Sequence, residues 1–589
     1  MRISGSPVLL ALMLATHTLL AQGPQQGRSS DGALTLDEKL VYISHNFMNS
    51  QNCEQAIGWL KTAAKAGYTG AVLHDCKFSR WDESVTVRRP EYDNNARRVR
   101  QTCRDLGMKA IVCCADMGMD LLSNDPNLAE GMPVAKAPFV VKGGRLVPAD
   151  DAFRLGNPSF EESRTPHQPT GWNVDFPGQC AFLDAAVRYS GKTSLRFDNI
   201  KANSANGNGR ANQVVKVDPW RYYHVSVMIR TAGFETPRNV NIIALGKANG
   251  LIHQTYEVAA TQDWKKYDVV FNTLDNTEIT FYVGAWGAGA GSIWFDDICY
   301  EPGGFVNLIR REGCPFQIDS EDGAVRYAEH KDFTDARDPK MGNTDWPGLY
   351  KYWYEQPVVR VPAGSRLQEG QKVLVSYYHC MNTLGWGVFA CMAEPKVLEI
   401  IRKQVAAIHQ VLEPDGYMMT HDEIRHMGWD ESCRKKGRSM AELLAGNVRD
   451  CARIIRKEDP GKLVYVWSDM FDPHQNAGKT GYYYLVRGKD PWYGSWEGLD
   501  KDIVIVNWHN FNPGRAEALK WFAERGHRQI LAGYYDAPST NILPWLEEAK
   551  RAPGVSGVMY TTWAQDFGEL STFIRVVNDW QAGAASQRK

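Results

Sequence analysis

The sequence predicts a mixed α/β protein: a (β/α)8 TIM barrel interrupted after its third strand by an all-β jelly-roll sandwich and a further β-rich segment. Short apolar runs that end in polar residues alternate with helix-patterned stretches near both ends of the chain, as in β/α units around a parallel sheet. Between them, from about Leu121 to Gln371, the sequence is rich in Gly, Pro, Asn and Asp and has almost no helical period. With 589 residues the chain exceeds the size of one hydrophobic core, so several domains are expected.

The first barrel part, residues 34–120, is predicted to contain three strands. They are Val41–Phe47, Ala71–Asp75 and Lys109–Ala115, separated by helices around Glu54–Ala66 and Asn94–Leu106. A doubly wound open sheet would also fit this alternation. Because no Gly-rich phosphate loop follows the first strand, the barrel is the preferred interpretation.

The second barrel part, residues 377–582, is predicted to contain the remaining five strands. A helix from about Lys396 to Val411 opens it, and amphipathic stretches such as Ala441–Arg456 and Ala516–Arg525 provide the outer helical layer that a barrel needs. The strands, which bring the total to eight, are Tyr417–Thr420, Leu463–Trp467, Ile503–Trp508, Gln529–Tyr534 and Gly557–Thr561.

The inserted residues 155–302 carry a motif series of their own. The series is Asn157-Pro158-Ser159-Phe160-Glu161, Gly171-Trp172, Gly191-Lys192-Thr193-Ser194-Leu195, Tyr222-Tyr223-His224-Val225 and Trp294-Phe295-Asp296-Asp297. It resembles the jelly-roll carbohydrate-binding modules of the CenC type. The resemblance implies a β-sandwich that binds glycan, acts as a spacer or carries a structural Ca2+ ion, and no other cofactor is expected. The following β-rich insert, residues 303–376, is expected to form a wall of the active site.

The N-terminal residues 1–21 have the pattern of a signal peptide. Arg2 precedes the apolar stretch Pro7–Ala15, and a second short apolar piece, Leu19–Ala21, follows. This stretch suits the core of a signal peptide and is too short for a membrane span. No later run of about 18 apolar residues appears, so a periplasmic or secreted protein is expected.

The amino-acid composition indicates which class of molecule the protein binds. The formal net charge is -1 and no dense Lys/Arg run appears, which argues against nucleic acid as a partner. The chain contains 19 Trp and 25 Tyr, whose flat rings can cover the apolar face of a sugar, so an oligo- or polysaccharide is expected. The 12 Cys do not fall into tight metal-binding spacings and are expected to form disulfides or to be buried, and the oligomeric state stays open.

Polar and aromatic residues follow every predicted barrel strand. Because active sites of barrel enzymes lie at the carboxyl ends of the strands, these residues are expected to form one pocket. They are His45-Asn46, His74-Asp75, Asp116-Met117, His421-Asp422-Glu423, Trp467-Ser468-Asp469, Trp508-His509-Asn510, Tyr534-Tyr535-Asp536, and Trp563 with Asp566.

The adjacent carboxylates Asp422 and Glu423 are the predicted catalytic pair. Cleavage of a glycosidic bond needs a proton donor for the leaving oxygen and a second group for the cationic centre. Two like charges close together raise one pKa and keep that carboxyl protonated near neutral pH. In a regular strand the two side chains would point to opposite faces, so the backbone is expected to turn there.

The string Thr420-His421-Asp422-Glu423 resembles the His/Gly-Gly-Asp-Glu motif of family-20 glycoside hydrolases, the β-N-acetylhexosaminidases. The resemblance implies Glu423 as general acid/base and Asp422 as the group that orients a 2-acetamido nitrogen. Further matches imply substrate contacts from Asp116, Tyr534, Asp536 and Asp566 and a pocket walled by Trp467, Trp508 and Trp563, with His421 and Asp469 beside them. Departures are His45-Asn46 in place of the family's Arg, His421 in place of Gly, and Gly118-Met119-Asp120 in place of Pro-Gly-His.

Three other functions fit the same residues. A conventional retaining hydrolase would use Glu423 as acid/base and Asp536 or Asp469 as nucleophile. A glycan-binding protein would keep the barrel and sandwich without needing a paired acid. Metal-dependent hydrolysis would use some of the histidines near strand ends, but no HExxH motif appears, so no metal ligand is assigned. These histidines are His45, His74, His379, His421, His426 and His509.

Overall fold

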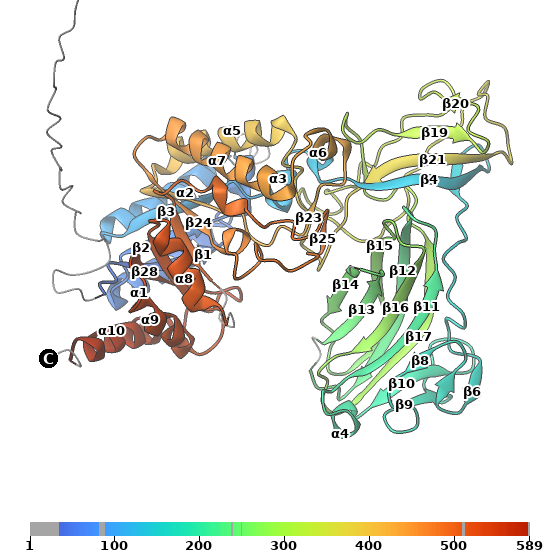
Figure 1. Ribbon diagram of the computed structural model, residues 1–589, viewed down its shortest axis with the longest axis horizontal. Coiled ribbons are helices and arrows are strands. Elements are labelled where there is room, and N and C mark those ends of the chain that lie inside the picture. Colours follow the sequence, from blue (N-terminus) through green and yellow to red (C-terminus); the bar gives the residue numbers. More distant parts are fainter. Residues whose placement is uncertain (1–33, 82–88, 237–238, 249, 509–512, 587–589) are drawn as a thin grey trace, which may run out of the picture.

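The computed structural model describes residues 34–81, 89–236, 239–248, 250–508 and 513–586; the predicted signal peptide lies outside these ranges. The fold is mixed α/β, with a closed barrel at one end of the molecule and a β-sandwich at the other (Figure 1). Among the described residues, every helix is too short or too polar to cross a membrane.

Eight parallel strands close into the barrel, and they follow chain order around it. The third barrel strand pairs directly with β22, so the long insertion leaves the barrel after β3 and returns before β22. The strands are β1 (Glu38–Ser44), β2 (Gly70–His74), β3 (Lys109–Cys114), β22 (Gly416–Met419), β24 (Leu463–Trp467), β26 (Val504–Asn507), β27 (Gln529–Tyr534) and β28 (Val555–Thr561).

Helices cover the outside of the barrel at seven of the eight strand connections or ends. They are α1 (Ser50–Ala66), α2 (Arg89–Asp105), α5 (Pro395–Leu412), α7 (Met440–Glu458), α8 (Arg515–Glu524), α9 (Leu543–Ala549) and α10 (Leu570–Ser586). Residues 468–503, between β24 and β26, contain only 3-10 turns and the short strand β25 (Leu485–Val486). The strict strand–helix alternation expected from the sequence is therefore broken at this point.

Alternate residues of the barrel strands fill its interior. Leu40 and Tyr42 of β1, Met418 of β22, and Tyr465 and Trp467 of β24 belong to one buried apolar cluster inside the barrel. The residues between them pack outward against the helices, as Val41 and Val464 do. This period of two is what a parallel barrel requires, and it fixes which side chains reach the open end.

The sandwich consists of two five-stranded antiparallel sheets with a shared apolar core. One sheet contains β15 (Gln262–Asn272), β12 (Tyr222–Ala232), β17 (Ser292–Pro302), β10 (Ser194–Asp198) and β9 (Ala181–Asp184). The other contains β14 (Gly250–Tyr256), β13 (Val240–Leu245), β16 (Glu278–Ala285), β11 (Gly209–Lys216) and β8 (Asn173–Val174).

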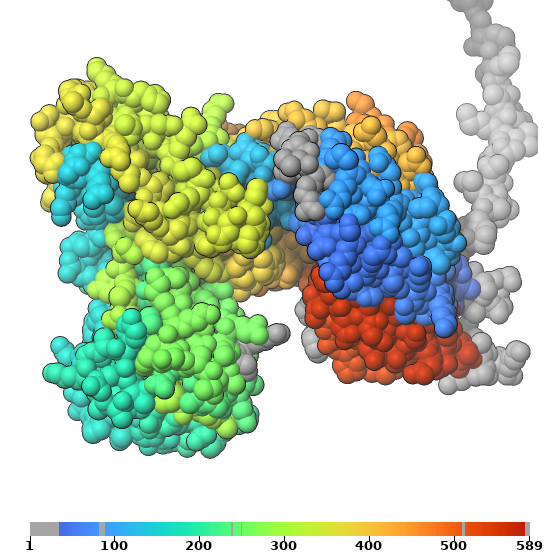
Figure 2. Space-filling model, turned by 180° about the vertical axis from the view of Figure 1, so that it is seen from behind, coloured from blue at the N-terminus to red at the C-terminus, as the bar shows by residue number. Residues whose placement is uncertain are grey.

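A six-stranded sheet joins the sandwich to the barrel and draws strands from both flanks of the insertion. Tyr377–His379, predicted to begin the second barrel part, instead complete β21 of this sheet, because His379 pairs with Met132 of β4. Figure 2 shows the yellow segments of this region bridging the barrel and the sandwich. The strands are β4 (Met132–Val141), β5 (Leu146–Pro148), β18 (Leu308–Ile309), β19 (Gln317–Ser320), β20 (Arg326–Tyr327) and β21 (Lys372–His379).

Candidate active site

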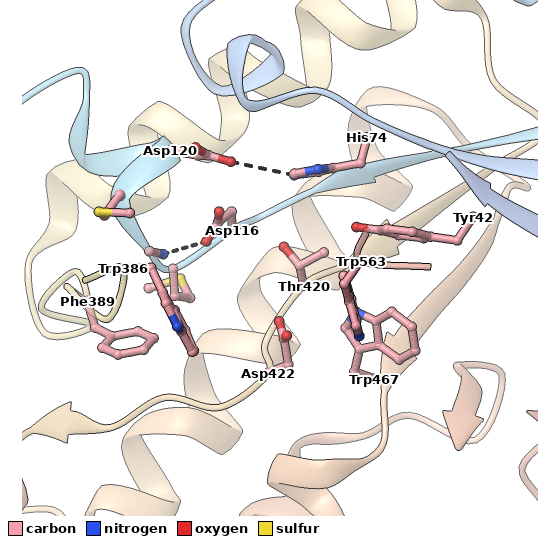
Figure 3. A pocket seen from close by; sticks show the side chains of 13 residues that line it. Tyr42, His74, Asp116, Asp120, Trp386, Phe389, Thr420, Asp422, Trp467 and Trp563 are labelled. Carbon is pink, nitrogen blue, oxygen red and sulfur yellow. Dashed lines mark hydrogen bonds and ion pairs between the residues drawn. The ribbon is translucent and has the colours of Figure 1, made fainter. Parts of the chain in front are cut away.

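A cavity of about 230 Å³ opens at the carboxyl ends of the barrel strands (Figure 3). Active sites of barrel enzymes lie at this end. The cavity is smaller than the roughly 300–1,000 Å³ of drug-sized sites, so it suits one small ring-shaped molecule. It combines aromatic rings with carboxyl groups, and its lining residues are Tyr42, His74, Asp116, Met117, Gly118, Met119, Asp120, Trp386, Phe389, Thr420, Asp422, Trp467 and Trp563.

The fourth barrel strand delivers Asp422 to the cavity and turns its neighbour His421 away. Met418 and Thr420 point inward, and the alternation continues to Asp422, which lines the cavity. His421 is fully buried on the other side, with Nε2 2.8 Å from Oδ1 of Asn447 on α7. His421, predicted as a substrate contact, does not line the cavity, because the strand period places its ring against a helix.

Burial also lowers the pKa of His421 to about 4. The unfolded chain keeps a pKa near 6.5, so the stability that the neutral ring contributes is present above pH 6.5 and lost as the pH falls towards 4. We expect the urea midpoint to fall between pH 7.5 and pH 5 by less in His421→Asn than in the wild type. An equal fall in both proteins would show that His421 does not carry this acid sensitivity.

Two carboxyl groups in the cavity are held in an environment that favours the protonated form. Burial, followed by the negative charges of Asp469, Asp116 and Glu423, raises the pKa of Asp422 well above its ordinary value. Burial and the charge of Asp120 raise the pKa of Asp116 to about 7. The cavity therefore holds carboxyl groups that can give up a proton near neutral pH.

A histidine and a carboxylate form the opposite wall. His74, at the end of β2, lies with Nδ1 2.9 Å from the Ser44 hydroxyl and Nε2 3.5 Å from Oδ2 of Asp120. Burial lowers the pKa of His74, but the hydrogen bond and charge of Asp120 outweigh it, so the net pKa is raised. Together with Asp116, this pair offers three metal-ligand atoms within 4.8 Å of one another.

Glu423 lies outside the set of cavity-lining residues. Its backbone has a φ of 45°, so the chain turns at Glu423 as expected. Its carboxylate forms an ion pair of 2.6 Å with Arg425, whose side chain is buried. The Arg425 guanidinium lies 4.7 Å from the ring centres of both Trp386 and Tyr484, a cation–π arrangement. Glu423 is therefore a fixed negative charge beside Asp422.

Asp469 contacts the backbone of Glu423 from behind and does not line the cavity. Its carboxylate accepts hydrogen bonds from the backbone N–H of Glu423 at 2.9 Å, from Trp508 Nε1 at 3.0 Å and from Asn476 Nδ2 at 2.8 Å. Burial raises its pKa to about 6 although these donors oppose the shift. Asp469 thus fixes both the Glu423 backbone and the Trp508 ring.

Aromatic rings from four strands surround the cavity. Tyr42 lies 5.6 Å from Trp563 and 6.0 Å from Trp467, measured between ring centres, and Trp467 lies 6.4 Å from Trp508. Trp563 is 55% exposed, so it offers a free face at the mouth. The structure therefore brings the three predicted Trp together, with Trp467 and Trp563 in the cavity and Trp508 behind them.

At the end of the seventh barrel strand, β27, the tyrosine side chains point in other directions than predicted. Tyr534 belongs to the cluster outside the barrel, and its hydroxyl donates to Oδ2 of Asp566 at 2.7 Å. Tyr535 instead packs against the interior cluster and stacks on Trp563. The cause is positive φ angles at Tyr534, Tyr535 and Asp536 of 79°, 50° and 58°, which interrupt the alternation. Tyr534 and Asp566, predicted as substrate contacts, are therefore not among the residues that line the cavity.

Asp536 stabilises the turn that follows β28. Its carboxylate accepts the backbone N–H groups of Trp563 at 2.8 Å and Ala564 at 3.0 Å, and it also bonds the Thr562 hydroxyl. These contacts hold the turn that presents Trp563 to the cavity, so Asp536 positions a wall residue rather than lining the cavity itself. His509 and Asn510 lie outside the described residues.

The insertion supplies residues that sequence reasoning missed. Trp386 and Phe389 come from the loop between β21 and α5, and Asp120 follows β3. Leu384 in this loop donates its backbone N–H to Gln254 of the sandwich at 2.9 Å. The sequence around these residues does not indicate that they line a cavity. The one exception is Trp386, because a large ring in a Gly-rich turn often projects from the turn.

Three groups of described side chains could hold a metal ion. One is His74, Asp116 and Asp120 in the cavity. The others are the buried set Glu130, Cys391, Asp430 and Cys433 and the partly exposed set Glu329, His330 and Asp335. Within the described part of residues 155–302, where a Ca2+ ion was expected, no such group occurs.

No protein-family model and no curated protein matches the chain. Solved structures similar to parts of it include a CBM4 carbohydrate-binding module, with 18% identity over 25% of this chain and 99% of that chain and a TM-score of 0.19. The CBM22-1 xylan-binding domain from Paenibacillus barcinonensis has 18% identity over 26% of this chain and 97% of its own, with a TM-score of 0.19. A rhamnosidase from a Novosphingobium species has 10% identity over 89% of this chain and 55% of its own, with a TM-score of 0.30. At these values the similarity assigns neither a family nor an activity to this chain.

Proposed function

We propose that the protein is a glycoside hydrolase of the (β/α)8 class that cleaves a terminal sugar from an oligo- or polysaccharide. The observation that carries this proposal is Asp422, a half-buried carboxyl with a raised pKa, in a cavity walled by Trp386, Trp467 and Trp563. Aromatic faces hold a sugar ring by stacking, and a neutral carboxyl can protonate the leaving oxygen. The small cavity volume supports an exo-acting enzyme.

The geometry favours Asp422 as the proton donor, which differs from the sequence-based assignment to Glu423. Two neighbouring carboxyl groups in unlike environments can take the two roles of acid and charged partner. Arg425 holds Glu423 as the charged member at 2.6 Å, and burial with nearby negative charges keeps Asp422 neutral. In this assignment the negative charge of Glu423 raises the pKa of Asp422 and so keeps Asp422 protonated.

The second group of the reaction is open to two assignments. Asp116 and Asp120 share the cavity with Asp422, and Asp116, which is not the partner of His74, can face the cationic centre or activate water. A 2-acetamido sugar would supply its own nucleophile, as the resemblance to family-20 enzymes implies. Asp536 and Asp469, the nucleophiles of the retaining alternative, are both occupied by N–H donors outside the cavity. A panel of aryl glycosides with and without a 2-acetamido group distinguishes the two assignments.

Replacing Glu423 by Gln tests the assigned roles. An acid must be protonated to act, so activity falls as the pH rises through the pKa of Asp422. Removing the negative charge of Glu423 lowers that pKa. We expect the alkaline limb of the kcat/KM profile to move to lower pH by about one unit, with the plateau kcat reduced less than about tenfold. Loss of activity at every pH would instead identify Glu423 as the acid.

A second candidate function is metal-dependent hydrolysis, which the grouping of His74, Asp116 and Asp120 favours. One imidazole and two carboxylates are suitable ligands for a divalent cation that keeps open positions for water and substrate. Dialysis against EDTA would abolish activity in this case, and added Mn2+ or Zn2+ would restore it. Unchanged activity after dialysis supports the metal-free route.

The remaining parts of the chain support an exported glycan-active enzyme. We propose that residues 1–21 direct export to the periplasm or the medium, and that the sandwich binds glycan near the catalytic pocket, with Ca2+ as a structural ion if it binds any. Secretion of the full chain, followed by determination of the N-terminus of the mature protein, tests the first of these. Binding of the protein to polysaccharide columns, with and without Ca2+, tests the second.

A further inference from the structure

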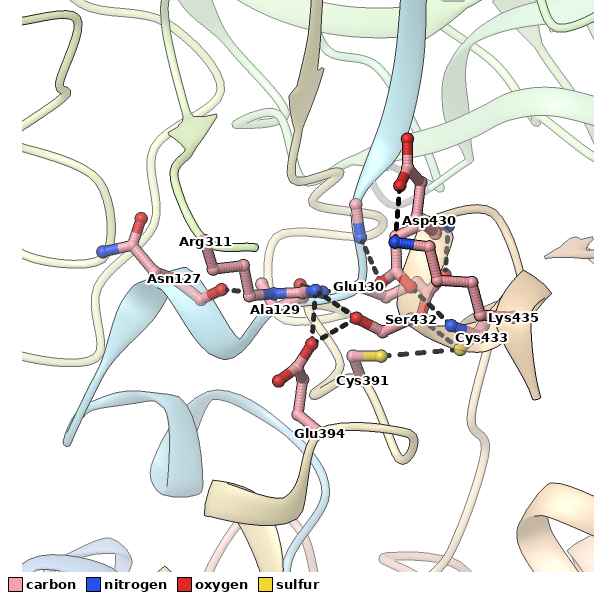
Figure 4. Close-up of polar contacts among 12 residues, drawn as sticks. Asn127, Ala129, Glu130, Arg311, Cys391, Glu394, Asp430, Ser432, Cys433 and Lys435 are labelled. Atoms are coloured by element: carbon pink, nitrogen blue, oxygen red, sulfur yellow. Dashed lines mark hydrogen bonds and ion pairs between the residues drawn. The ribbon is translucent and has the colours of Figure 1, made fainter. Parts of the chain in front are cut away.

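Four buried side chains with metal-binding atoms meet where the insertion joins the barrel (Figure 4). Glu130 precedes β4, and Cys391 precedes α5. Asp430 and Cys433 open the short helix α6 (Glu431–Lys435). Each of the four is at most 2% exposed, and their ligand atoms all lie within 4.8 Å of one another. This cluster is separate from the cavity and plays no part in the proposed hydrolysis.

Two distances between ligand atoms are close to those of a tetrahedral zinc shell. The two Sγ atoms of Cys391 and Cys433 are 3.4 Å apart, and Sγ of Cys433 is 3.3 Å from Oε2 of Glu130. Zn–S bonds of about 2.3 Å and Zn–O bonds of about 2.0 Å place the ligand atoms of a tetrahedron roughly 3.3–3.8 Å apart. A zinc ion therefore fits between them with only small shifts.

Neighbouring hydrogen bonds already orient the two carboxylates. Oε1 of Glu130 accepts the backbone N–H of Trp429 at 2.6 Å, which leaves Oε2 directed at the thiols. Oδ1 of Asp430 accepts the backbone N–H of Cys433 at 2.8 Å, and Oδ2 accepts from Arg311 at 2.6 Å. Glu130 Oε1 also accepts the backbone N–H of Asp430 at 3.2 Å, and Asp430 Oδ2 also accepts that of Gly131 at 3.4 Å, so Glu130 Oε2 and Asp430 Oδ1 keep a further acceptor site. Such outer contacts are characteristic of metal ligands.

A bound cation would also balance the charge that the cluster carries once its ligands have given up their protons. Two thiols and two carboxyl groups carry up to four negative charges when deprotonated, and Arg311 supplies one positive charge in contact with them. Uncompensated charges are costly to bury. A divalent cation offsets most of the remainder, and thiolate ligands favour zinc over magnesium or calcium.

We propose that Glu130, Cys391, Asp430 and Cys433 form a structural zinc site that ties the insertion to the barrel. The site has four protein ligands and no open position, so it has no catalytic role of its own. Cys391 is two residues beyond Phe389, so zinc would anchor the loop that brings Trp386 and Phe389 to the cavity. The ligands come from three distant segments, which is why no sequence spacing reveals them.

The test is the metal content of the full chain, purified without chelator and measured by inductively coupled plasma mass spectrometry. We expect one zinc ion per chain in the wild type and at least a tenfold loss in Cys391→Ser/Cys433→Ser. A matched control, Cys103→Ser/Cys451→Ser, removes two buried thiols elsewhere and should keep the zinc. Cobalt in place of zinc should give the absorption of a tetrahedral thiolate site.

A thiol titration of the wild-type protein covers the case in which the variant does not fold. Under native conditions the two thiols should react only after a strong chelator is added, and chelation should lower the thermal midpoint. Wild-type protein without zinc that also fails to take up added zinc would overturn the proposal. Intact-mass detection of a disulfide between Cys391 and Cys433 would overturn it as well.

Discussion

Replacing Asp422 by Asn should lower kcat about 10²–10⁴-fold on sugars with poor leaving groups, because the variant has no proton to give to the departing oxygen. The side chain keeps its size, so the cavity and its aromatic walls should remain intact. The measurement is steady-state hydrolysis of aryl glycosides whose leaving groups span a wide range of acidity.

The dependence of activity on the leaving group distinguishes the loss of the proton donor from a loss of folded structure. An activated dinitrophenyl leaving group needs no proton, so the Asp422→Asn variant should recover most of its activity on that substrate. Asp450→Asn makes the same chemical change on the exposed side of α7 and should behave as the wild type. An equal loss for all leaving groups would contradict the role of Asp422 as acid.

Replacing Arg528 by Ala should destabilise the barrel by roughly 3 kcal/mol, the lower end of the range for breaking a buried ion pair. Arg528 pairs with Glu38 at the start of β1, and Tyr465 of β24 donates its hydroxyl to the same carboxylate at 2.7 Å. Glu38 is 5% exposed, so its charge would lose its cationic partner in a nearly dry place. Urea unfolding followed by circular dichroism measures the effect.

A surface ion pair gives the control for this prediction. Arg154 and Asp151 pair in the same way, but their side chains are 69% and 81% exposed. Arg154→Ala should therefore change the free energy of unfolding by less than about 1 kcal/mol. A similar loss of unfolding free energy in both variants would show that the contacts of Glu38 with Arg528 and Tyr465 do not stabilise the barrel.

The order of the barrel strands could be predicted from the sequence because each strand is a short apolar run followed by polar residues. The sequence could not predict the direction in which the side chains just after each strand point. Ala115, Glu423 and Tyr534 have φ angles of 54°, 45° and 79°. A residue with positive φ interrupts the alternation of the strand, so Asp116 turns into the cavity and Tyr534 turns out of it. Strained backbone of this kind gathers at functional sites, and residue type alone does not reveal it.

Contacts between distant segments were the other part that the sequence could not supply. Trp386 reaches the cavity because Gln254 of the sandwich holds its loop, although more than a hundred residues separate the two. Arg425 holds Glu423 by a contact that only the turn after β22 creates. The sequence thus indicated the neighbouring carboxylates Asp422 and Glu423, and their different surroundings became visible only in the fold.

Asp422→Asn and Glu423→Gln, assayed side by side on one aryl glycoside with a poor leaving group, test the assignment of Asp422 as the acid most directly. This assignment predicts that Asp422→Asn loses activity on this substrate at every pH, whereas Glu423→Gln stays active at low pH with its alkaline limb shifted. An active Asp422→Asn variant beside an inactive Glu423→Gln variant would contradict it.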